Sequence, residues 1–98
     1  GPEPEIVPPY SRDWAEAKGQ ETLYRALARH LTVIDPRAAA PGDVVLLRMK
    51  ARSPAKHCGI LAGRQDALTL IHARQNAKVS EEAFTPAWRR RLAFALRL

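Results

Sequence analysis

The stretch HCGILAGRQDALTLIH, residues 57–72, decides the fold of this chain. Two segments of strand-like composition, residues 57–62 and 67–72, flank a polar connection that contains Gly63 and Asp66. These two turn-forming residues predict a β-hairpin whose turn is centred between Arg64 and Gln65. In that register Ala62 faces Ala67, and His57 lies directly across from His72.

The pattern on either side of this hairpin predicts an α+β fold with a helix followed by an antiparallel sheet. Leu23, Leu27 and Leu31 recur at helical spacing within residues 21–31, and the apolar run at residues 44–47 follows a Pro-Gly-Asp turn as a buried strand would. The remaining predicted elements are a strand at residues 31–34, a strand that begins at Val79, a helical turn at residues 85–88 with Thr85 as its cap and Pro86 at its first position, and a last strand within residues 91–98.

Length and composition indicate a single domain. The chain has 98 residues, and four prolines in residues 1–10 predict an extended arm before the domain at residues 11–98. No apolar run is long enough to cross a membrane and no signal peptide opens the chain, so we expect no membrane insertion. The net charge of +6 favours anionic partners, but basic residues are scattered apart from Arg89–Arg91, so we expect a solvated basic surface and no specific nucleic-acid partner.

The predicted hairpin gives His57 and His72 a common site. Residues that face each other across an antiparallel pair have Cβ atoms about 4.5–5.5 Å apart, on one face of the sheet. Two imidazoles at that distance can act as a catalytic base and the group that orients it. Spacing alone leaves a purely structural role open, because histidine pairs in strands are often structural.

Cys58 follows His57 directly, so in a regular strand its side chain points to the other face. We therefore predict a buried structural thiol at Cys58 rather than a nucleophile for the histidine pair. A zinc site is the other standard interpretation of a His/Cys/His set, but it meets the same geometric objection and lacks a recognisable fourth ligand. The sequence predicts neither a metal nor another cofactor.

Three segments, in this order, resemble the NlpC/P60 family of bacterial and phage cell-wall cysteine peptidases. PGDVVLL at residues 41–47 resembles a strand of that family, HCGI at residues 57–60 resembles the strand that carries its general base, and LIHA at residues 70–73 resembles the strand that orients the base. The Trp14 region and the Trp88–Arg91 segment are closest to the phage-tail subgroup, and related peptidases occur in tail-like gene transfer agents.

The resemblance implies a papain-like fold and hydrolysis of a stem-peptide amide in peptidoglycan, with His57 as general base and His72 as its orienting residue. The family's nucleophile is a cysteine in a D-C-x-[GS]-[LF] motif that opens an earlier helix, and nothing like it occurs between Gly1 and Pro41. We therefore expect residues 11–98 to be the C-terminal part of such a domain, inactive without the cysteine segment.

The expected partners are peptidoglycan and phage-like tail proteins. The expected location is the tail of a phage-like particle that acts in the periplasm or at the cell wall. A non-catalytic structural or wall-binding domain of a tail assembly is the alternative, and a cysteine motif upstream of Gly1 would distinguish the two.

Overall fold

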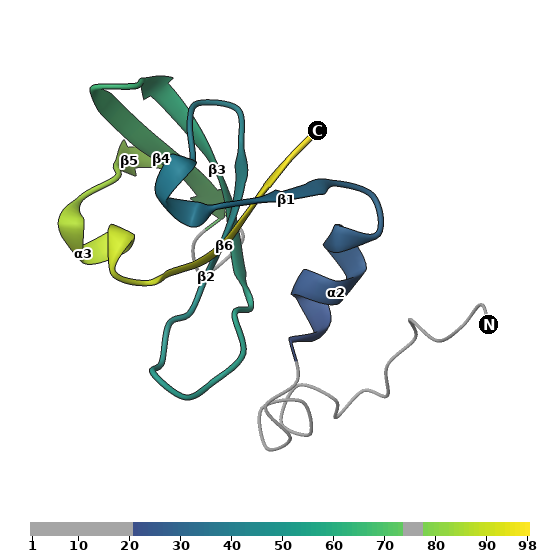
Figure 1. Cartoon of the computed structure of the whole chain (residues 1–98). Helices are drawn as coiled ribbons and strands as arrows, with labels where there is room; N and C mark the ends of the chain where they lie inside the picture. Colours follow the sequence, from purple (N-terminus) through teal and green to yellow (C-terminus); the bar gives the residue numbers. More distant parts are fainter. Residues whose placement is uncertain (1–20, 74–77) are drawn as a thin grey trace.

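The computed structural model describes residues 21–73 and 78–98, and Figure 1 shows their arrangement. The predicted arm at residues 1–10 and the Trp14 region lie outside the described residues. The described elements, in chain order, are α2 (Thr22–Ala28), β1 (Thr32–Ile34), the 3-10 helix η2 (Pro36–Ala38), β2 (Val44–Leu47), β3 (His57–Arg64), β4 (Ala67–Ala73), β5 (Val79–Ala83), α3 (Pro86–Arg89) and β6 (Leu92–Arg97).

The six strands form one sheet in the order β1-β6-β2-β3-β4-β5, and every neighbouring pair is antiparallel. The predicted α+β class with an antiparallel sheet is therefore confirmed. The helical turn is also confirmed, because the Thr85 side chain accepts a hydrogen bond from the Trp88 N–H and Pro86 opens α3.

The hairpin of β3 and β4 has a different register from the one expected. Its turn lies at Gln65–Asp66, so Arg64 pairs with Ala67. The residue that pairs with His72 is therefore Gly59 and not His57. Gly63 has a positive φ of 82°, but it takes up this conformation inside β3 rather than in the turn. Gly63 therefore did not mark the position of the turn. The predicted pairing of β3 with β4 was wrong by two residues.

Each face of the sheet has its own apolar cluster, and Figure 1 shows α2 and α3 on opposite sides of the sheet. We call the face that carries His57 and His72 the histidine face; there Trp88 of α3 packs against a core that contains Leu47, Leu61 and Leu70. The members of the cluster on the opposite face are Leu46, Ala55 and Leu96, with partly buried partners that include Leu23, Tyr24 and Leu27 of α2.

Among the described residues, the opposite face is covered over β2 and β6 but not over β3. The α2 helix is only seven residues long and packs against the β2 and β6 side chains. Cys58 and Ile60 on β3 are exposed, Ile60 to 46%. The prediction of a buried thiol at Cys58 was therefore wrong, although the residue does lie on the face away from the histidines, as predicted. Its partner on β2 is Leu46.

A polar clasp joins the turn before β2 to the end of β6. The carboxylate of Asp43 is buried and accepts hydrogen bonds from Nε and Nη2 of Arg97, both at 2.8 Å, and from the backbone N–H of Ala40 at 2.8 Å. The Arg97 hydrogen bonds lower the pKa of Asp43 below its usual range. Gly42 precedes it with a φ of 96°, which explains why the turn uses glycine there.

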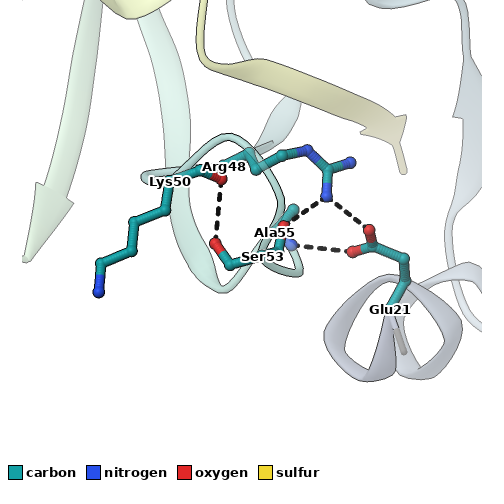
Figure 2. A network of polar contacts seen from close by, with 5 residues as sticks. All are labelled: Glu21, Arg48, Lys50, Ser53 and Ala55. Atoms are coloured by element: carbon teal, nitrogen blue, oxygen red, sulfur yellow. Dashed lines mark hydrogen bonds and ion pairs between the residues drawn. The ribbon is translucent and has the colours of Figure 1, made fainter. Parts of the chain in front are cut away.

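A second polar network joins the start of α2 to the loop that leads into β3 (Figure 2). One carboxylate oxygen of Glu21 accepts from Nη1 of Arg48 at 2.7 Å, and the other accepts from the backbone N–H of Ala55 at 2.8 Å. Arg48 also donates to the carbonyl of Ser53 at 2.6 Å. The hydrogen bond from Ala55 to Glu21 thus holds the loop two residues before His57.

We expect Glu21→Ala to lower the free energy of unfolding by about 1–3 kcal/mol, the cost of leaving a buried N–H without an acceptor. The affected donor is Ala55, which is fully buried. Urea denaturation measures the loss, and amide exchange at Ala55 should become faster. Thr22→Ala, an exposed change at the next position, should leave both quantities unchanged. Equal effects from the two variants would show that the helix start, and not this network, carries the stability.

Candidate functional site

His57 and His72 meet on the histidine face. Nε2 of His57 lies 2.7 Å from Nδ1 of His72, and the two rings are nearly perpendicular at 87° with centroids 4.9 Å apart. His57 begins β3 and is half-buried, while His72 near the end of β4 is only 4% exposed. The prediction that the two histidines share one face is confirmed, and their ring nitrogens lie within hydrogen-bonding distance.

The two-residue change in register did not separate the histidines, because the side-chain period of a strand is two. His57 reaches His72 along a diagonal, a distance of about 7–8 Å between backbones that long side chains can span. The residue directly across from His72 is Gly59, which leaves the space for this diagonal contact.

A side chain at position 59 would meet the neighbouring strand. A Cβ atom there would lie 2.6 Å from Cδ1 of Leu70, 3.0 Å from the carbonyl oxygen of Ile71 and 3.3 Å from Cβ of His72. A Cβ atom at this position would therefore displace the Leu70 side chain and crowd the backbone of β4.

We expect Gly59→Ala to destabilise the fold by about 1–3 kcal/mol, as overpacking of a close-packed interior does. The shift of β4 should also lengthen the contact between His57 and His72, which histidine ring chemical shifts would report. Ala62→Gly, on the same strand but half-buried on the opposite face, is a control that should leave the ring signals in place. Unchanged stability and unchanged ring signals in Gly59→Ala would show that the approach of the strands does not depend on this glycine.

Glu82 on β5 extends the histidine pair to a third strand. Nε2 of His72 lies 2.7 Å from Oε2 of Glu82, so the contacts run from His57 through His72 to Glu82. Glu82 pairs with Leu70 in the register, and Ser80 lies across from His72, so this contact is again a diagonal one past a small residue. The three polar side chains therefore form one line across β3, β4 and β5.

Trp88 on α3 packs over this line. Its indole Nε1–H donates to Oε1 of Glu82 at 3.2 Å. Its ring is nearly parallel to that of His57, at 13° and 5.9 Å between centroids, and edge-on to that of His72, at 76° and 5.1 Å. The Arg91 guanidinium lies 5.8 Å from the Trp88 ring centroid. The short helix α3 thus places the indole ring of Trp88 against both histidines.

Glu82 and Trp88 were not predicted from the sequence as site residues. Glu81 and Glu82 are adjacent, and their pattern does not say which of them faces the histidines. The helical turn that carries Trp88 was predicted, but its contact with β3 and β4 depends on how the chain returns over the sheet. Alternation along β5 places Ser80 and Glu82 on one face, but it does not show that this is the face of the histidines.

The arrangement can accept, hold and return a proton, but the histidine face has no thiol beside it. Cys58 is the only cysteine in the sequence, and it lies on the opposite face. Although Cys58 is exposed, loss of water contact where its thiol lies against the sheet raises the thiol pKa, which disfavours the thiolate needed for attack. Among the described residues, no group of three or more His, Cys, Asp or Glu side chains is placed to hold a metal ion, and no helix there is long and apolar enough to cross a membrane.

A line of His, His and Glu, with the outer histidine half-exposed, is an arrangement suited to general acid–base chemistry. The geometry alone identifies no substrate. Comparisons of the chain with protein-family models, with curated proteins and with solved structures find no match.

Proposed function

We propose that this chain supplies the general base and its orienting residues to a cysteine peptidase that hydrolyses stem-peptide amides of peptidoglycan. The observation that carries the proposal is the 2.7 Å contact between Nε2 of His57 and Nδ1 of His72. A half-exposed imidazole fixed by a buried one is what a cysteine nucleophile needs beside it.

The resemblance of residues 41–47, 57–60 and 70–73 to the NlpC/P60 family supports the substrate class and a papain-like fold. Each of these segments belongs to a strand of the antiparallel sheet or to the turn that opens one, in the order β2, β3, β4. The resemblance of Trp14 and of Trp88–Arg91 to the phage-tail subgroup supports association with tail proteins.

The proposed nucleophile is a cysteine on a segment outside Gly1–Leu98, since the one cysteine here lies on the wrong face. Its thiol proton passes to Nδ1 of His57, and the sulfur attacks the amide carbonyl carbon. His57 then returns the proton to the leaving amine as the C–N bond breaks. A water molecule, deprotonated by His57, hydrolyses the thioester and restores the thiol.

The experiment is an assay of the protein produced together with the coding sequence upstream of Gly1, on purified peptidoglycan. We expect new free amino groups to appear as stem peptides are cut, and we expect none from residues 1–98 alone. If an upstream segment with a cysteine at a helix start is present and no amino groups are released, the peptidase proposal is wrong.

A non-catalytic wall-binding or structural domain of a tail assembly is the second candidate. The position of Cys58 favours it, because the sequence itself contains no thiol that can reach the histidines. This candidate predicts that the protein co-sediments with peptidoglycan and releases no amino groups. It also predicts that His57→Ala leaves co-sedimentation unchanged.

A further inference from the structure

We propose that Glu82 is a positioning residue that fixes the tautomers of both histidines, so that Nδ1 of His57 carries the lone pair. A continuous line of contacts runs from His57 through His72 to Glu82. Its catalytic consequence rests on the proposed function, but the assignment of the tautomers does not.

The order of donors and acceptors follows from the carboxylate. An ionised carboxylate only accepts hydrogen bonds, so Nε2 of His72 must carry a hydrogen to donate to Oε2 of Glu82. A neutral imidazole has one protonated nitrogen, so Nδ1 of His72 is then an acceptor. The 2.7 Å contact therefore requires Nε2 of His57 to be the donor, which leaves the lone pair of His57 on Nδ1.

Trp88 explains why the end of this line has to be a carboxylate. The indole Nε1–H is always a donor, and it points at the second oxygen of Glu82. Two donors, from His72 and from Trp88, thus converge on one side chain. Glutamine has the same shape but only one oxygen, so it can satisfy only one of them.

Burial makes the hydrogen-bond order strict. The His72 side chain is 2% exposed and that of Glu82 is 32% exposed, so water cannot readily replace a lost partner at His72. An unpaired polar group in such a place costs more than a hydrogen bond gains. Trp88 also packs edge-on against the His72 ring, which opposes rotation of the imidazole away from Glu82.

The test is a long-range proton–nitrogen NMR correlation on the ¹⁵N-labelled chain, followed to the alkaline end of a histidine titration. We expect pyrrole-type Nε2 and pyridine-type Nδ1 signals for both His57 and His72. Exposed His30, the third histidine of the sequence, serves as the reference. Pyrrole-type Nδ1 signals at His57 or His72 would overturn the proposal.

Three variants test whether the carboxylate of Glu82 sets the tautomers of the histidines. In Glu82→Gln the amide must turn its NH₂ group to one of two donors, and we expect a second set of His57 and His72 signals with the tautomers exchanged. Trp88→Phe in the same background removes the competing donor and should return the wild-type set. Glu81→Gln removes the neighbouring carboxylate, which faces the other way and pairs with Thr69, and should change neither histidine.

Histidine signals that are the same in Glu82→Gln as in the wild type would overturn the role of the carboxylate. None of these measurements needs peptidase activity. If the tautomers are as stated and no peptidoglycan is cut, the proposed function fails alone. If peptidoglycan is cut and the tautomers are reversed, the positioning role fails alone.

Discussion

Replacing His57 with alanine should lower the rate of peptidoglycan cleavage by at least about 10²–10⁴-fold in protein that carries the cysteine segment, because the variant has no proton acceptor for the thiol. The measurement is the rate of free amino group release. His57 is half-buried at the first position of β3, so the variant should still fold. A folded His57→Ala protein with wild-type turnover would remove this histidine from the mechanism.

His72→Ala and Cys58→Ser are the informative companions of that variant. His72→Ala keeps the proton acceptor and removes the group that orients it, so we expect a smaller loss of rate than in His57→Ala. Cys58→Ser should keep most of the activity, because its side chain lies on the face away from the histidines. Complete loss of turnover in folded Cys58→Ser would mean that the strand does not keep its alternation at this position.

The largest expected effect on stability is that of Asp43→Ala, at roughly 3 kcal/mol, the lower end of the range for breaking a buried ion pair. The lower end applies because Arg97 is half-exposed and can return to water once its partner is gone. The change also leaves the N–H of Ala40 without its acceptor. Urea denaturation at neutral pH measures the loss.

The effect of Asp43→Ala should depend on pH in a defined direction. The Arg97 hydrogen bonds hold the pKa of Asp43 below its usual value in the folded protein. The stabilisation is therefore complete above the ordinary carboxyl pKa of about 3.9 and is lost as the pH falls through the lower folded value. The difference in unfolding free energy between wild type and variant should shrink below about pH 4.

Asp66→Ala is the matched control for Asp43→Ala. Asp66 also faces an arginine, Arg64, but at 3.4 Å and with both side chains mostly exposed. Exposed ion pairs contribute little to stability, so this variant should unfold like the wild type. If the two aspartate variants lose the same free energy, the clasp between the β2 turn and β6 is not what stabilises the fold.

Features that depend on local periodicity were predictable from the sequence. The strands around the histidines, the cap at Thr85 and the shared face of His57 and His72 all follow from patterns within a few residues. The shared face was predicted correctly even though the register was wrong, because a shift of two residues preserves the side of every side chain. The position of the turn was not predictable from Gly63, since glycine can adopt a positive φ within a strand as well as in a turn.

Features that depend on what covers the sheet were not predictable. Cys58 is exposed because, among the described residues, the short helix α2 packs over β2 and β6 and not over β3. The role of Glu82 depends on the register of β5 against β4, and that of Trp88 on the return of α3 over the histidine face. Such tertiary facts leave no local trace in hydrophobic spacing.

The four side chains of the site also lie close together in the gene. His57, His72, Glu82 and Trp88 come from β3, β4, β5 and α3, which are consecutive in the chain. One uninterrupted stretch of coding sequence therefore specifies all four side chains, without a contribution from α2 or β1. Recombination at the borders of that stretch would transmit these four residues together, whereas β2, which pairs with β3 in the sheet, would come from outside it.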